Sequence, residues 1–218
     1  MIIIGELING TRPRVAAAIA SRDAEFIANL ARKQAQAGAD YIDCNSGRVG
    51  VAEAEDLAWL VQTVEAAADR PVSLDSANPE AIAAALQVCH GAPPLINSVM
   101  ADEGQLAAVL PMVSAAGASV IALALDDAAA APAPARRVQI AQDLVQRITA
   151  AGISPERIFV DPVVAPLRTS AEAPRLACET MRLIRHELPD CHIVCGLSNV
   201  SHGLPARALL NRTFLAQA

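Results

Sequence analysis

The chain has 218 residues, of which 53% are hydrophobic and only 2% aromatic, and its formal net charge at pH 7 is −6. The apolar fraction excludes a disordered chain, and the length is sufficient for one large hydrophobic core. Proteins that bind nucleic acid need basic side chains for the phosphates and aromatic rings for stacking, and both are scarce here. We therefore expect a globular protein without a nucleic-acid partner.

Residues 104–125 carry no charge and are long enough to span a bilayer. Pro111 and Gly117 divide this stretch into a helix and a strand, so the core of a soluble protein explains it better than a membrane span. The chain begins without the basic segment of a secretory signal peptide, and its odd number of scattered cysteines is typical of reduced thiols. These features predict a cytoplasmic protein without a membrane partner.

Short apolar runs alternate along the chain with longer, alanine-rich segments of helical periodicity. Repeated strand–helix units with continuous apolar strands are typical of a parallel sheet that is covered by helices. Asn78 followed by Pro79 predicts a helix N-terminus, and residues 128–135 predict a surface loop. The predicted strands are 2–4, 41–44, 72–74, 94–96, 120–125, 158–160 and 192–195, and the predicted helices are 23–38, 53–68, 79–88, 104–115, 136–151, 172–187 and 205–216.

Two architectures contain such a sheet, the doubly wound α/β fold and the closed (β/α)8 TIM barrel. The glycine-rich phosphate motifs typical of doubly wound nucleotide-binding folds do not occur, so we predict the barrel, as a single domain over residues 1–218. Only seven strands are found and such a barrel usually has about 250 residues, so the eighth βα unit is expected to be missing. We expect the domain to be C-terminally incomplete or to take its last strand from elsewhere.

Carboxylate or amide side chains follow six of the seven predicted strands. In a barrel the carboxyl ends of the strands converge on one mouth, where active sites are built. A turn or cap explains any one of these side chains, but the set favours a flat heterocycle that carries several N–H donors and ring acceptors. The side chains are Glu6, Asn9, Asp43, Asn45, Asp75, Asn97, Asp161 and Asn199, with the hydroxyl of Ser198 next to the last of them.

Other chemistries have little support in the sequence. Lys33, the only lysine, lies in a predicted outer helix, which argues against a Schiff-base mechanism. On a strand Cys191 and Cys195 share one face and His192 lies on the other, so these residues predict buried thiols and no metal site. Cys44 is expected to be a packing residue. Four arginines are candidates for the anionic tail of a ligand, with surface or structural ion-pair roles as the alternative: Arg48, Arg168, Arg207 and Arg212.

The string Ile4-Gly5-Glu6-Leu7-Ile8-Asn9-Gly10 resembles the start of the pterin-binding methyltransferases that use methyltetrahydrofolate and a corrinoid protein. The resemblance covers nearly the whole chain and implies a (β/α)8 TIM barrel of the pterin-binding type. Cys44, Ser46 and His202 depart from the family pattern. Further matching strings follow in the same order, at residues 43–47, 74–76, 96–98, 160–162, 196–201 and 211–215.

The resemblance also implies roles for particular residues. Asp75, Asn97 and Asp161 are expected to hydrogen-bond the edge of the pterin ring. Asn199 is expected near N5 as the catalytic residue, because methyl transfer from N5 requires that this nitrogen be protonated or strongly hydrogen-bonded. The other expected substrate-binding residues are Glu6, Asn9, Asp43, Ser198 and Arg212.

The implied function is transfer of the N5-methyl group between methyltetrahydrofolate and the cobalt of a corrinoid (cobalamin) that a partner protein carries, in either direction. A homodimer is also expected. One alternative is a pterin condensation like that of dihydropteroate synthase, whose pattern has a lysine near strand seven where this chain has Gly196-Leu197-Ser198-Asn199. The other alternative is an inactive folate-binding barrel fragment.

Overall fold

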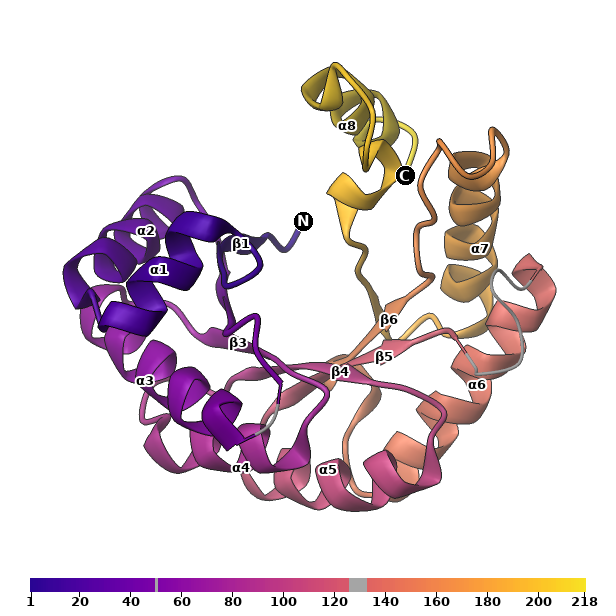
Figure 1. Ribbon diagram of the computed structural model, residues 1–218. Helices are drawn as coiled ribbons and strands as arrows, with labels where there is room; N and C mark the ends of the chain where they lie inside the picture. The colour runs from indigo at the N-terminus through magenta and orange to yellow at the C-terminus, as the bar shows by residue number, and fades with distance from the viewer. Residues whose placement is uncertain (50, 126–132) are drawn as a thin grey trace. The chain divides into compact units, whose positions relative to one another are not determined.

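The computed structural model describes residues 1–49, 51–125 and 133–218. Contacts group the chain into two compact units, and in Figure 1 indigo marks the start of the first unit and yellow the end of the second. The first unit comprises Met1–Ser98 and Ala107–Val120, and the second comprises Val99–Leu106 and Ile121–Ala218. Each unit repeats the pattern of a strand followed by a helix.

The first unit is built on parallel strands that follow the order of the chain. β1 pairs with β2, β2 with β3, and β3 with β4, and the N–H of Ser119 donates to the carbonyl of Pro94 at 2.9 Å, which places the start of β5 beside β4. Its elements are β1 (Ile4–Asn9), α1 (Pro13–Ser21), α2 (Ala24–Gln36), β2 (Tyr41–Asn45), α3 (Val51–Ala67), β3 (Val72–Asp75) and α4 (Pro79–Val88). The residues of β4 (Leu95–Val99), α5 (Glu103–Ala115) and β5 (Ser119–Leu123) are divided between the two units.

Apolar side chains of neighbouring strands form the core of this unit. Ile42, Leu74 and Ile96 on successive strands are all fully buried. Helix α3 packs between α2 and α4 on one side of the strands, as Figure 1 shows. Because the strands pair in register, with Asp75 opposite Asn97, the polar residues at their carboxyl ends lie at the same edge of the sheet.

The second unit contains the later elements. The N–H of Ala124 donates to the carbonyl of Asp161 at 2.9 Å, and β6 pairs in parallel with β7. Helices α6 and α7 lie side by side, and Phe214 of α8 joins a buried cluster with Val164, Met181 and Val200. The elements are α6 (Pro134–Ala150), η1 (Pro155–Arg157), β6 (Ile158–Asp161), α7 (Ala173–Glu187), β7 (His192–Ile193), η2 (Leu197–Ser201) and α8 (Arg207–Leu215).

Most predicted elements are present, with several corrections. The first strand runs to Asn9 rather than ending at Ile4, and β7 is shorter than the predicted 192–195. The sequence prediction missed helix α1. The predicted helix at 104–115 is present as α5 and includes Pro111. Of the predicted loop at 128–135, residues 128–132 lie outside the described part of the chain, whereas Pro134 already begins α6.

The structure tests two further sequence predictions, the helix cap at Asn78 and the assignment of the charge-free stretch at 104–125. The side chain of Asn78 accepts a hydrogen bond from the N–H of Glu80 at 3.0 Å, which confirms the predicted cap of α4. Among the described residues, no helix combines the length and the apolar character needed to cross a membrane. The charge-free stretch at 104–125 instead supplies α5 and β5.

The loops that follow β1 and β2 touch through their backbones. The N–H of Gly10 donates to the carbonyl of Asn45 at 2.8 Å, and a Cβ atom on Gly10 would lie 1.9 Å from the carbonyl oxygen of Ser46. Gly47 has a φ of +67° and would meet the backbone of Gly10 at 2.3 Å. Glycine is therefore required at both positions, once for close approach and once also for a left-handed conformation.

We predict that Gly10→Ala lowers the free energy of unfolding by about 1–3 kcal/mol, because the new methyl group forces the two loops apart. Chemical denaturation followed by circular dichroism measures the change. Gly104→Ala is the matched control, since its Cβ would come no closer than 3.4 Å to another atom and it lies within helix α5, where alanine is favoured. Equal stability of the two variants would contradict the prediction.

Candidate functional site

Polar side chains of the first unit gather at the carboxyl ends of β1 to β4. Asn9 pairs with Asn45 across β1 and β2, and Asp75 pairs with Asn97 across β3 and β4. Asp43 lies two residues before Asn45 and is almost completely buried, at 1% exposure. The structure thus brings together the residues of this unit that the strand-end pattern singled out.

Two buried or half-buried carboxylates hold the two asparagines of this edge. The Nδ2 group of Asn45 donates to Oδ2 of Asp75 at 2.6 Å. Oδ1 of Asp43 accepts hydrogen bonds from Oγ of Ser73 at 2.6 Å and from Nδ2 of Asn97 at 3.2 Å. Because the amide NH2 group of Asn97 is directed at Asp43, the side-chain carbonyl oxygen of Asn97 is turned away from that carboxyl group. The edge therefore presents two hydrogen-bond acceptors, the Asp75 carboxylate and the Asn97 carbonyl oxygen.

Burial, together with the charges of neighbouring carboxylates, raises the proton affinity of the carboxyl groups at this edge. Burial, followed by the charge of Asp75, raises the pKa of Asp43 well above its ordinary value, and the hydrogen bonds from Ser73 and Asn97 only partly oppose this effect. Burial also raises the pKa of Asp75, against the hydrogen bond from Asn45. Both groups consequently favour the protonated form more than an ordinary aspartate does.

Glu6 belongs to the same electrostatic group. Its pKa is raised first by the loss of solvent around the carboxylate and then by the charge of Asp75, whereas the guanidinium of Arg12 acts in the opposite direction. The side chain of Asn9 stabilises the turn that follows it, because its Oδ1 accepts hydrogen bonds from the N–H of Thr11 at 2.9 Å and from Oγ1 of Thr11 at 2.6 Å. Asn9 therefore shapes the loop that carries Arg12.

Glu53 of helix α3 holds the segment that follows Asp75. Its Oε1 accepts from Oγ of Ser76 at 2.5 Å, and its Oε2 accepts from Nδ2 of Asn78 at 3.2 Å. The Glu53 residue is only 7% exposed. This contact fixes the β3–α4 segment from the outside of the sheet.

Asp161, in the second unit, ends β6 and shapes the turn that follows. Its Oδ1 accepts from the N–H of Val163 at 2.7 Å, and Val163 has a φ of +59°, a strained conformation for a β-branched residue. The guanidinium of the buried Arg137 donates to the carbonyls of Pro162 and Val163, the latter at 2.6 Å. Burial lowers the pKa of Arg137 and the nearby Asp161 charge raises it.

Ser198 and Asn199 lie in η2, where the backbone turns sharply. Asn199 is exposed, and a Cβ on Gly196 would lie 2.8 Å from Nδ2 of Asn199, so the amide occupies space that only a glycine leaves open. The carbonyl of Ser198 accepts from Nη2 of Arg207 at 3.1 Å. Arg207 thereby ties the start of α8 to η2, in agreement with a structural role.

The remaining arginines and cysteines of the sequence analysis have simple surroundings. Arg48 forms an ion pair with Asp56, Nε to Oδ2 at 3.3 Å, and Arg212 is exposed on α8. The buried thiol of Cys44 has its pKa raised well above the usual value, mainly by burial, which fits a packing residue. Within residues 1–49, 51–125 and 133–218 no group of three or more histidine, cysteine, aspartate or glutamate side chains is placed to hold a metal ion.

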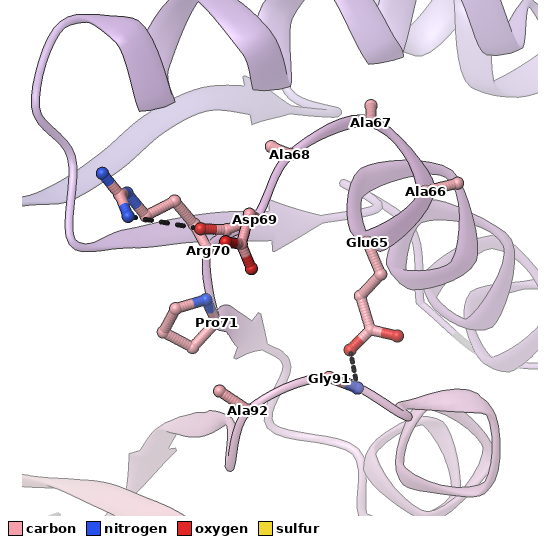
Figure 2. Close-up of a pocket in the computed structure, with 9 residues that line it drawn as sticks. All are labelled: Glu65, Ala66, Ala67, Ala68, Asp69, Arg70, Pro71, Gly91 and Ala92. Carbon is pink, nitrogen blue, oxygen red and sulfur yellow. Dashed lines mark hydrogen bonds between the residues drawn. The ribbon is translucent and has the colours of Figure 1, made fainter.

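A cavity of about 370 Å³ lies away from these polar side chains, at the amino end of β3 (Figure 2). Residues 65–71 line it together with Gly91 and Ala92. The Glu65 carboxylate there accepts from the N–H groups of His90 and Gly91, each at 3.0 Å, and is thus occupied by the chain itself. Because Asp75 ends the strand that begins beside this cavity, the two sites lie at opposite ends of β3.

Sequence reasoning missed three residues that hold the strand-end side chains. Ser73 is a polar residue inside a buried strand, which is a usable signal for an internal hydrogen bond. Arg137 shares the apolar helical spacing of Ala141 and Leu144, so its position on the buried face of α6 was readable from the sequence. Glu53 has no such signal, because the partners of its carboxylate come from a segment more than twenty residues away.

We predict that Asp43→Asn stabilises the protein increasingly as the pH rises. A carboxyl group with a raised pKa in the folded state contributes stability at low pH that is lost as the pH rises toward that folded pKa, whereas asparagine stays neutral and keeps an oxygen for Ser73 and Asn97. The variant should match the wild type near pH 4 and exceed its free energy of unfolding by about 1 kcal/mol or more at pH 8.

Urea denaturation at a series of pH values measures this difference. Asp143→Asn is the control, because Asp143 is exposed on α6 and its substitution leaves the buried carboxyl group of Asp43 in place. A stability difference for Asp43→Asn that is the same at every pH would show that Asp43 ionises like an ordinary aspartate.

The fold is similar to that of solved dihydropteroate synthases. The enzyme of Xanthomonas albilineans in complex with 7,8-dihydropteroate matches 99% of this chain and 82% of its own, with a TM-score of 0.69 and 20% identity. The enzyme of Thermus thermophilus in complex with 6HMPPP gives a TM-score of 0.68 at 18% identity, with the same coverage. Identity at this level concerns the fold alone, and it confirms the predicted α/β class of the TIM-barrel type, of which the described residues contain seven strands.

Sequence relatives are more specific. The chain is 36% identical, over 217 residues, to the methylcorrinoid:tetrahydrofolate methyltransferase of Eubacterium limosum, and the match covers 99% of this chain and 80% of that protein. It is 28% identical over 228 residues to the methionine synthase of Mycobacterium tuberculosis, of which it spans only 19%. The family model described as "Pterin binding enzyme" matches residues 5–217. With this match over nearly its whole length, the chain belongs to the pterin-binding enzyme family.

Proposed function

We propose that this chain transfers the N5-methyl group between methyltetrahydrofolate and the cobalt of a corrinoid that a partner protein carries. The observation that carries the proposal is the 36% identity with a methylcorrinoid:tetrahydrofolate methyltransferase over 99% of this chain. The strings that resemble this family lie along β1, at the ends of β2, β3, β4 and β6, in η2 and in α8. The direction of transfer stays open, and the homodimer and the cytoplasmic location stay predictions.

The acceptor-rich edge of the first unit supports a pterin ligand. A pterin carries N–H donors on its 2-amino group and on N3, side by side on one edge of the ring. An ionised Asp75 accepts two parallel hydrogen bonds, as carboxylates do with planar donors, and the Asn97 carbonyl oxygen accepts another. Asn45 holds Asp75, and Asp43 holds Asn97, so both side chains are oriented before the ligand arrives.

Asn199 is proposed as the residue that acts on N5. The C–N bond of a tertiary amine breaks readily only when the nitrogen receives a proton or a strong hydrogen bond as its electron pair returns to it. A neutral amide donates through Nδ2 and accepts through Oδ1, so it can follow N5 through both protonation states and favour the transition state. Because Asn199 is exposed and rests against Gly196, its amide is accessible to a ligand.

The corrinoid enters this proposal as a substrate on a second protein. Its cobalt supplies the atom that accepts or donates the methyl group. This chain binds the folate, orients N5 and provides the hydrogen bond that follows the protonation of N5. Asp161 is proposed to bind the pterin as well, and Ser198, Glu6, Asn9 and Arg212 are proposed as further contacts to the folate.

The solved dihydropteroate synthases do not favour a pterin condensation for this chain, because their identity of 17–20% concerns the fold. The only lysine, Lys33, lies on α2 rather than near strand seven, where that reaction's pattern places one. The methyltransferase is the function that both the sequence relatives and the strand-end residues support.

We predict that the wild-type chain binds methyltetrahydrofolate and that Asp75→Ala weakens this binding at least about 30-fold, because two charge-assisted hydrogen bonds are lost. Isothermal titration calorimetry at pH 7 measures both affinities. Asp143→Ala, which removes an exposed carboxylate on α6, should bind like the wild type. A wild-type protein that is folded and does not bind the folate would overturn the proposed function.

We also predict that Asn199→Ala lowers the rate constant for methyl transfer to free cob(I)alamin by about 10- to 100-fold, while folate affinity changes less than about threefold. The reason is that the amide acts on N5 mainly in the transition state. The loss of cob(I)alamin absorbance in single-turnover experiments gives the rate, with Asn29→Ala on the exposed side of α2 as the control. An unchanged rate constant would remove Asn199 from the mechanism.

A further inference from the structure

A buried carboxylate outside the strand ends lies behind the folate-binding edge proposed above. Glu53 projects from the first turn of α3, is 7% exposed and accepts hydrogen bonds from two neutral side chains, Ser76 and Asn78. A buried carboxylate is costly unless its hydrogen bonds are satisfied. The hydrogen bonds from Ser76 and Asn78 offset this cost and link Glu53 to the segment that follows β3.

The contacts of Glu53 lead directly to the two acceptors of the proposed site. Ser76 follows Asp75 in the chain, and its N–H donates to the backbone carbonyl of Asn97 at 2.9 Å. Oγ of Ser76 donates to Glu53 and also accepts from the N–H of Asn78 at 3.0 Å. One carboxylate on α3 thus fixes the backbone segment on which Asp75 and Asn97 both depend.

Glu53 also acts through its charge. It is one of the groups that raise the pKa of Asp75, after the effect of burial. The other titratable groups whose charges couple to Asp75 are Asp43 and Cys44 on β2 and Glu6 on β1. Among the described residues, the basic group that acts on this set is Arg12, which affects Glu6. A negative charge on Glu53 therefore adds to the negative charges around Asp75, where few positive charges are present to oppose them.

We propose that Glu53 is a positioning residue of the folate site, which holds Asp75 and Asn97 through Ser76 and sets, by its negative charge, the pH range in which Asp75 binds the ligand. The inference rests on the proposed function, because it takes the folate as that ligand. Ionised Asp75 accepts the pterin N–H groups and protonated Asp75 does not, so binding weakens as the pH falls through the Asp75 titration. Removal of the Glu53 charge moves this loss of binding to lower pH.

The test compares Glu53→Gln with the wild type in folate affinity between pH 4.5 and 8. The acid midpoint of binding is expected to fall by at least about half a pH unit, because one nearby negative charge is lost. Glu55→Gln is the matched control, since Glu55 lies on the same helix and is exposed. A midpoint that coincides with that of the wild type and of Glu55→Gln would overturn the electrostatic part of the proposal.

A second measurement needs no ligand. Carbon-detected NMR of the Asp75 side-chain carboxyl, in the wild type and in Glu53→Gln, follows its titration directly, and the midpoint should fall in the variant. If the wild type does not bind the folate, the proposed function fails, while this titration still decides whether Glu53 controls Asp75. If the wild type binds and the titration is the same in both proteins, only the inference about Glu53 fails.

Ser76→Ala separates positioning from charge and leaves α3 unchanged. It removes the hydrogen bond to Glu53 but keeps the negative charge, so the acid midpoint should not fall, while folate affinity at pH 7 should weaken about 3- to 10-fold as the segment after Asp75 loosens. Affinity equal to that of the wild type would overturn the positioning part. If Glu53→Gln does not fold, the folate affinity of Ser76→Ala still decides the positioning part of the proposal. Glu53→Asp, which keeps the negative charge, then tests the electrostatic part, and the titration midpoint of Asp75 in that variant should match the wild type.

Discussion

Carboxylates buried at the ends of parallel strands need hydrogen-bond donors, because an unpaired buried charge costs several kcal/mol. In the first unit these donors are neutral side chains: Asn45 for Asp75, Ser73 with Asn97 for Asp43, and Ser76 with Asn78 for Glu53. Each donor comes from another strand or segment. The arrangement of the whole edge therefore depends on hydrogen bonds from amide and hydroxyl groups to carboxylate oxygens.

Neutral donors have a consequence that arginine or lysine partners would not have. They orient a carboxylate without cancelling its charge, so burial first, and then the charges of neighbouring carboxylates, raise the pKa values of Asp43, Asp75 and Glu6. A ligand whose edge carries several N–H donors relieves that repulsion when it binds. An anionic ligand edge would instead add to it, and this difference favours the pterin ring over the phosphate or carboxylate part of a ligand as the group held by Asp75 and Asn97.

The sequence was sufficient for what depends on local patterns and insufficient for what depends on distant partners. The Asn78 cap and the polar residues at the ends of β2, β3 and β4 follow from short strings, and the structure has them where they were expected. The first strand was placed too early because Glu6 interrupts the apolar run, although β1 needs only one buried face and continues to Asn9. The role of Glu53 was not readable, because Ser76 and Asn78 meet it only after α3 has packed.

In the second unit a buried guanidinium and the backbone conformation, rather than neutral side-chain donors to carboxylates, position the polar residues, and this difference affects the chemistry proposed for Asn199. There a buried guanidinium, Arg137, holds the backbone carbonyls after β6, and Val163 is kept in a left-handed conformation beside Asp161. Asn199 is placed by the backbone of η2 and by the space above Gly196. An amide placed in this way does not titrate, so its ability to donate or accept does not change with pH. Under the proposed function, the acids of the first unit determine the pH range of folate binding, while Asn199, the group proposed to act on N5, stays available at every pH at which binding occurs.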